Sequence, residues 1–316
     1  MDDVSSDSQH PAVLNPRDEL VARHCPICGS ADESRVFADA HLDPSRLDEF
    51  AFASRKIPEY MHYRLITCPV CDLLYASPAP TTEALARAYR DAGFDSGEEA
   101  RYASRTYAGY LPAIIRRIPD RHGAIDIGTG DGAFLRELLA AGFDDVAGVE
   151  PSKTPVDSAR DDVRSLIRND IFRPEQFDTG RFSLITCFQT MEHVPDPLAL
   201  ARATYTLLKV GGAAFFIGHN RESVVNRLLG RKSPIFDIEH LQLFSPRSAR
   251  AMFERAGFVD VEVRRVVNRY PLSYWTKLFP LPKSIKHGCL AAMKATGIGR
   301  LPIPMAVGNI AVIGYK

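Results

Sequence analysis

Short apolar segments alternate with longer amphipathic segments from residue 123 to the end of the chain. AIDIG, DVAGVE, FSLITCF, AAFFIG and GNIAVIGY have the composition of buried strands, and VDVEVRRVV alternates like a half-buried strand. Between them, GAFLRELLAAG, DPLALARATYTLLKVGG and SPRSARAMFERAGF have helical spacing, the second with a glycine pair at its predicted end. Strands alternating with helices of about 10 to 15 residues imply right-handed crossovers. The sequence therefore predicts a doubly wound α/β fold with a mostly parallel sheet.

The chain of 316 residues is long enough for one large domain with an extension. We expect a disordered polar tail over residues 1–20 and a cysteine-containing module over 21–80. The main domain is expected over 81–267, with a substrate-side loop or lid at 218–245. A basic and apolar C-terminal segment, 268–316, is expected to end in the last strand of the sheet.

The stretch AIDIGTGDGAF, residues 124 to 134, forms a glycine-rich turn after the first of these strands. Gly128, Gly130 and Ala133 satisfy the dinucleotide pattern G-x-G-x-x-G/A, whereas the lysine and Ser/Thr of a phosphate-binding loop are absent. Glu150 ends the next strand and can accept both hydroxyls of a ribose, which suits NAD and S-adenosylmethionine equally. Asp126 favours the second ligand, because a carboxylate repels a pyrophosphate but attracts an ammonium and a sulfonium.

These segments, taken in order, resemble the class I S-adenosylmethionine-dependent methyltransferases over about residues 100 to 265. AIDIGTGDGAF resembles their first motif, and RNDIF resembles their adenine-contacting segment. The resemblance implies a Rossmann-like, seven-stranded sheet and S-adenosylmethionine as the cofactor. It also implies that Glu150 orients the ribose and that Asp170 contacts adenine. The turn from Asp126 through Gly128 and Gly130 to Gly132 would then hold the amino-acid end.

Glu192 and His193 are the candidate catalytic residues, because they follow the strand FSLITCF at the sheet edge where open α/β folds bind ligands. An unperturbed imidazole titrates near neutrality, so His193 is the candidate base for a hydroxyl acceptor. Related quinone O-methyltransferases carry an acid three residues before the Glu-His pair and bind a divalent metal there. This chain has Gln189 at that position, so we expect Gln189 to line the cofactor pocket and a catalytic metal to be absent. His219 and His240 are second candidates, and structural roles for all three histidines stay open.

Two C-x-x-C pairs lie in HCPICGS and TCPVCDL. Each pair can direct two thiolates at one point, so Cys25, Cys28, Cys68 and Cys71 predict a closed, structural zinc site. Iron or an iron–sulfur cluster is the alternative. Similar knuckles precede the methyltransferase domain in some bacterial enzymes that act on sugars and secondary metabolites.

Charge is distributed unevenly along a chain whose formal net charge is zero. Residues 263–316 contain nine Lys or Arg and no Asp or Glu. This stretch can bind an anionic, lipid-linked or nucleotide-linked acceptor and make peripheral membrane contact, or pack on the acidic body of the domain. No nucleic-acid partner is expected. The N-terminus lacks a secretory signal, and four of the six cysteines suggest metal ligation, so we expect a cytoplasmic protein.

Together these features predict an S-adenosylmethionine-dependent methyltransferase that methylates an oxygen of a small-molecule, sugar or glycan acceptor. Sugar C-methylation is a weaker alternative, because the long C-terminal domain of the sugar C-methyltransferases is missing. A zinc-knuckle scaffold with a silent methyltransferase-like domain, and an RNA methyltransferase, are the remaining hypotheses.

Overall fold

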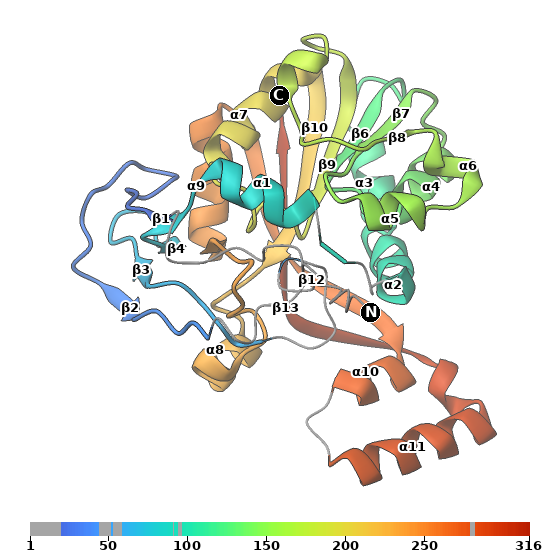
Figure 1. Ribbon diagram of the computed structural model, residues 1–316. Helices are drawn as coiled ribbons and strands as arrows, with labels where there is room; N and C mark the ends of the chain where they lie inside the picture. The colour runs from blue at the N-terminus through green and yellow to red at the C-terminus, as the bar shows by residue number, and fades with distance from the viewer. Residues whose placement is uncertain (1–19, 44–51, 53–58, 91, 94–96, 279–281) are drawn as a thin grey trace, which may run out of the picture.

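A seven-stranded sheet forms the centre of the computed structural model, which describes residues 20–43, 52, 59–90, 92–93, 97–278 and 282–316 (Figure 1). The expected disordered tail lies outside these residues except for Leu20. The strands follow the order β12-β13-β10-β9-β6-β7-β8, and β13 alone is antiparallel to its neighbours. Their bounds are β6 (Ala124–Ile127), β7 (Val146–Val149), β8 (Ile167–Arg168), β9 (Phe182–Phe188), β10 (Leu208–His219), β12 (Val259–Pro271) and β13 (Pro302–Tyr315). The predicted Rossmann-like, mostly parallel sheet is confirmed.

One expected helix end is wrong. The glycine pair Gly211–Gly212 was expected to end a helix, but that helix, α7 (Pro197–Leu207), stops at Leu207 and both glycines lie inside β10. A register shift between Leu208 and Ala213 accommodates them in the pairing of β10 with β9. A bulge of this kind has the same local composition as a glycine helix end, so sequence spacing did not distinguish them.

Helices cover both faces of the sheet with separate apolar clusters. On one face lie α2 (Gly97–Ala108), α3 (Leu111–Ile115) and α4 (Ala133–Ala140), packed through Tyr107, Ile114 and Leu135. On the other lie α7 and α9 (Pro246–Ala256), packed through Leu200 and Phe253. The short helices α5 (Lys153–Asp157) and α6 (Asp161–Arg164) connect β7 to β8.

A second sheet contains most of the N-terminal cysteine module, but one of its four strands comes from elsewhere. Its order is β11-β4-β3-β2, where β2 (Val36–Ala38), β3 (Leu65–Thr67) and β4 (Leu74–Ala76) belong to the N-terminal part. The fourth strand, β11 (Gln242–Leu243), comes from the predicted lid and pairs antiparallel with β4. A two-stranded pair, β1 (Leu20–Val21) with β5 (Ala79–Pro80), precedes α1 (Thr82–Arg90).

The C-terminal segment projects from the long β12–β13 pair (Figure 1). It contains α10 (Leu272–Leu278) and α11 (Lys283–Thr296), and α8 (Val224–Leu229) packs against β13 nearer the main domain. The residues described include no helix with the length and apolar composition needed to span a bilayer.

Candidate active site

The glycine turn and the loop after β9 meet at the centre of the sheet. β6 lies between β7 and β9, and the chain runs from β6 to β7 and β8 on one side before it crosses to β9 on the other. Open α/β sheets bind ligands at the carboxyl ends of the strands at such a reversal. Gly128, with φ +75°, permits the close approach of the glycine turn to the loop after β9, because a Cβ there would lie 2.2 Å from Thr190 Oγ1. The structure therefore brings together the predicted residues of segments 126–132 and 189–193.

Glu150 lies directly after β7 and holds the glycine turn. Its Oε2 accepts the Gly130 N–H at 2.9 Å, and its Oε1 accepts the Ser152 N–H at 2.9 Å. The residue is only 8% exposed, and burial raises the pKa of its carboxyl. Because each carboxylate oxygen accepts more than one hydrogen bond, Glu150 keeps acceptor capacity for ligand hydroxyls. Gly130 has φ +57° and open space at its Cβ position, so its backbone leaves room for a ligand.

Asp170 follows β8 and is less enclosed than Glu150. Its carboxylate accepts the Ile171 N–H at 2.8 Å and lies 3.2 Å from Arg173 Nη1. Asn169, which the sequence analysis did not identify, donates from Nδ2 to the Glu150 carbonyl oxygen at 2.9 Å. This bond fixes the predicted adenine-contacting segment beside the predicted ribose-binding residue.

Three histidines from separate segments meet beside the loop after β9. The ring of His240 lies 4.9 Å from that of His193 and 5.1 Å from that of His219, measured between centroids. Burial lowers the pKa of His193 and of His219 to about 4, and lowers the pKa of His240 well below its usual value. All three are therefore neutral at pH 7. The expectation that His193 titrates near neutrality assumed an unperturbed imidazole, and burial changes that value.

Tyr89 and Glu239 contact the His193 ring, and neither was identified from the sequence. The Tyr89 hydroxyl lies 3.0 Å from His193 Nδ1, and Glu239 Oε2 lies 3.8 Å from the same nitrogen. Tyr89 belongs to α1, whose end is held by a hydrogen bond from Ser152 Oγ to the Tyr89 carbonyl oxygen at 2.6 Å. Glu239 is next to His240 in the sequence, which was a usable signal, whereas nothing distinguished Tyr89 from other helical tyrosines. His193, Glu239 and His240 present ligand atoms within 4.8 Å of one another, an arrangement that can hold a proton or a divalent cation.

Glu192 is fully buried and connects the ends of β9 and β10. Its Oε1 accepts the His219 N–H, and its carbonyl oxygen accepts the Leu241 N–H at 2.9 Å. Burial raises the pKa of the Glu192 carboxyl to about 7. The side chain thus points into the protein, while His193 lies beside Tyr89 and His240.

Comparison with known protein families identifies the family of this chain. The family described as "Methyltransferase domain" matches residues 100–263, which is more than half of the chain. The chain belongs to the class I S-adenosylmethionine-dependent methyltransferases. The match begins inside α2 and ends inside β12, so it includes the glycine turn and the ends of β7, β8, β9 and β10 that carry the site residues.

Curated relatives of this methyltransferase include ubiquinone biosynthesis O-methyltransferases. The Acinetobacter baylyi protein is 34% identical over 115 residues, which is 34% of this chain and 48% of that protein. The Stutzerimonas stutzeri protein is 37% identical over 108 residues, which is 31% of this chain and 44% of that protein. The chain thus spans about half the length of the curated relatives it matches. Among solved structures, a SAM-dependent methyltransferase from Thermotoga maritima aligns with a TM-score of 0.46 at 19% identity, covering 70% of this chain and 93% of that one.

Buried oxygen atoms lie where the glycine turn of the methyltransferase meets the loop after β9. Asp126 is 3% exposed and accepts the Thr186 hydroxyl at 2.6 Å, and burial raises the pKa of Asp126 to about 7. Within the described residues, Gln189 Oε1 and Glu192 Oε2 are buried and have no hydrogen-bond partner. Unpartnered buried acceptors are costly and indicate a missing donor. An ammonium group supplies such a donor, so Asp126 and Gln189 fit the amino group of S-adenosylmethionine.

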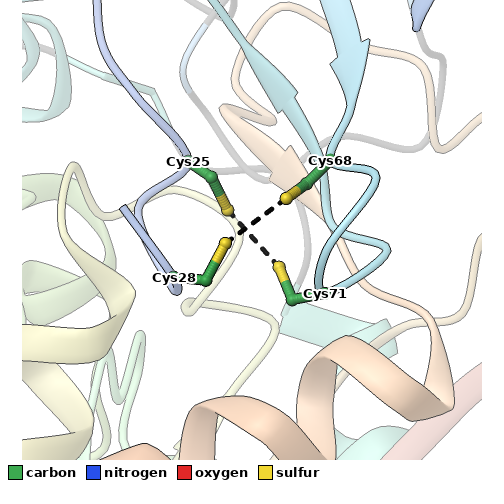
Figure 2. Close-up of side chains that lie close together, drawn as sticks. All are labelled: Cys25, Cys28, Cys68 and Cys71. Carbon is green, nitrogen blue, oxygen red and sulfur yellow. Dashed lines mark hydrogen bonds between the residues drawn. The ribbon is translucent and has the colours of Figure 1, made fainter. Parts of the chain in front are cut away.

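The four paired cysteines of the methyltransferase converge on one point (Figure 2). Cys25 and Cys71 Sγ lie 3.4 Å apart, as do Cys28 and Cys68 Sγ, and all four are free thiols. Tetrahedral zinc with Zn–S bonds of 2.3 Å separates its sulfurs by about 3.8 Å, so small adjustments accommodate the ion. Each knuckle closes at a residue with positive φ, Gly29 or Asp72. The hydrogen bond between the two sulfurs lowers the pKa of the Cys25 thiol and raises that of Cys71, so one proton shared by the pair favours a thiolate at Cys25.

Proposed function

We propose that this protein transfers the methyl group of S-adenosylmethionine to a hydroxyl oxygen of a small-molecule acceptor. The observation that carries the proposal is His193, neutral and held by Tyr89 beside the glycine turn. The relatives named as O-methyltransferases support an oxygen acceptor. The chemistry supplied by the cofactor is an electrophilic methyl group on a sulfonium.

In this proposal three groups of residues bind three parts of the cofactor. Glu150 binds the ribose hydroxyls. Asp170 gives up its ion pair with Arg173 and contacts adenine instead. Asp126 and Gln189 face the amino-acid end, which the Gly128, Gly130 and Gly132 turn encloses. A cationic ligand stabilises the ionised form of Asp126, whose raised pKa of about 7 makes it responsive to that charge.

His193 acts as the base through Nε2 when Nδ1 carries the proton. Tyr89 Oη, 3.0 Å from Nδ1, can accept an Nδ1–H, and the negative charge of the Glu239 carboxylate 3.8 Å away favours a proton on that nitrogen. Glu192 holds the strand ends that carry His193 and His219 and is a positioning residue. Because the pKa of His193 is about 4, its neutral ring is a weak base, and proton transfer to it is less unfavourable from a phenol, with a pKa near 10, than from a less acidic sugar hydroxyl.

The test is a turnover assay with methyl-labelled S-adenosylmethionine and a panel of acceptors. The panel pairs catechols and phenols with sugars and nucleotide-linked sugars of similar size, each with and without a lipid tail. We expect label in the phenolic products as methyl ethers, with one equivalent of S-adenosylhomocysteine released. Transfer to sugar hydroxyls alone would overturn the acceptor class, and a C-methylated product would overturn O-methylation. A preference for tailed acceptors would assign the basic C-terminal segment, where Ile285 and Leu301 are 53% and 52% exposed, to acceptor binding.

The cysteine cluster is proposed to hold one structural zinc ion. We expect purified protein to contain about one zinc per chain, and Cys68→Ser to lose most of that metal. The same change is expected to lower the Tm by about 5 °C or more, because zinc binding contributes directly to the folding of such modules. Metal analysis and thermal unfolding measure both effects. Cys289→Ser in α11 is the matched control and should leave zinc content and Tm unchanged; zinc-free wild-type protein, or iron in its place, contradicts the proposal.

A further inference from the structure

Arg23 connects the cysteine module to the loop that carries His193. It stands two residues before Cys25, and its guanidinium donates from Nε to the Ala76 carbonyl oxygen at 2.8 Å, inside the module. Nη1 donates to the Pro195 carbonyl oxygen at 2.9 Å, and Nη2 to that of Leu241 at 2.6 Å. A single planar group therefore joins the module to the segments that supply His193 and His240.

Gln242 completes this connection. It is fully buried and lies in β11, the strand that the main domain contributes to the sheet of the module. Its Nε2 donates to the carbonyl oxygens of Met191 and Val194, both at 2.8 Å, and its Oε1 accepts from Arg23 Nη2 at 3.0 Å. Hydrogen bonds from Arg23 and Gln242 thus hold the backbone before and after His193, at Met191, Val194 and Pro195.

The cofactor side has a separate set of bonds. Glu150 and Gly130 bond to each other, to Ser152 and to neighbouring strands of the main sheet. Arg23 forms hydrogen bonds with Ser77, Ala76, Pro195, Leu241 and Gln242, none of which belongs to that set. Loss of the Arg23 side chain therefore leaves the bonds between Glu150, Gly130 and Ser152 in place.

We propose that Arg23 is a positioning residue for methyl transfer, through which the metal-bound cysteine module sets the placement of His193. The inference rests on the proposed role of His193 and on the proposed zinc site. A metal ion on Cys25 fixes the short segment that carries Arg23, and a displacement of about 1 Å in a reacting group lowers rates by about 100-fold. Loss of the metal or oxidation of the thiolates would then reduce turnover without releasing the cofactor.

The test compares Arg23→Ala, Arg23→Lys and Arg247→Ala in the full-length chain. Arg247 is the matched control: it extends from α9 to the Val70 carbonyl oxygen at 2.6 Å, so it contacts the second knuckle but not residues 191–195. We expect Arg23→Ala to lower kcat about 10- to 100-fold, with a Kd for S-adenosylhomocysteine within twofold of wild type and zinc retained. Arg23→Lys keeps one donor and should recover part of kcat, and hydrogen exchange should increase at residues 190–196 in the alanine variant. Arg247→Ala should stay within twofold in every measurement.

Three results would overturn the inference. Wild-type kcat in Arg23→Ala shows that the contact does not position the base. An equal loss of kcat in Arg247→Ala shows that only the stability of the module matters. Parallel loss of cofactor binding in both Arg23 variants shows a general disruption. If the wild-type protein contains no zinc, the zinc proposal fails by itself, and if His193→Ala keeps full turnover, the proposed base fails by itself.

Discussion

Replacing Glu150 by alanine is expected to weaken binding of S-adenosylmethionine about 100-fold or more. The two ribose hydroxyls lose their hydrogen bonds to the carboxylate, and each bond to a charged acceptor contributes about 1.5 to 3 kcal/mol. The change also removes the bonds that hold Gly130 and Ser152 in place. Calorimetry with S-adenosylmethionine and S-adenosylhomocysteine measures the effect. Glu150→Gln keeps one oxygen acceptor and should lose less affinity than the alanine variant.

The control for Glu150 is another carboxylate of the same domain. Asp162 in α6 pairs with Arg136 and Arg160 at the surface, and Asp162→Ala should leave cofactor affinity unchanged. Thermal unfolding of each variant separates loss of binding from loss of folding. An alanine variant at 150 that binds within threefold of wild type would contradict the ribose role.

Replacing His193 by alanine is expected to lower kcat by about 100- to 10,000-fold, the usual contribution of a positioned general base. Binding of S-adenosylmethionine should stay within threefold of wild type, because Glu150 and Asp170, the residues proposed for ribose and adenine, follow β7 and β8 and not β9. Single-turnover measurement with a phenolic acceptor gives the chemical step directly. His122→Ala is the matched control, since His122 is exposed beside Asp144, just before β6 at the opposite edge of the sheet from the site.

The pH dependence gives a second test of the same residue. The neutral imidazole is the active form, and its pKa is about 4, so the group loses activity as the pH falls through that value. We therefore expect a kcat that is constant with respect to His193 from pH 6 upward, without the inflection near pH 6.5 of an ordinary histidine. Full turnover in His193→Ala would contradict the role of His193 as the base. An inflection near pH 6.5 that this variant removes would contradict its lowered pKa.

Local sequence was sufficient to predict the glycine turn and the strands on either side of it. The glycine turn, its strand and Glu150 lie within 27 residues, so strand periodicity and turn chemistry specify them together. The two cysteine knuckles could also be predicted from the sequence, because each is a local turn. The helix end at Gly211–Gly212 was the exception, since a strand bulge has the same residues.

The acceptor side depends on contacts between distant segments. His193, His219 and His240 meet because β9 and β10 are neighbours and because β11 returns to the module. Tyr89 reaches His193 from a helix 104 residues earlier. The two-residue strand β11 is too short to show a periodic pattern, so neither its pairing with β4 nor the role of Arg23 could be predicted.

The pairing of β11 with β4 also limits how this protein can be divided. A fragment that starts after Pro80 would leave β11 as an unpaired edge and uncover Leu241 and Leu243, both fully or almost fully buried in the intact chain. A fragment that stops at Pro80 would lack the outer strand of its own sheet. Neither half can be transplanted alone into another enzyme; a chimera would have to carry the 220–245 segment together with the cysteine module.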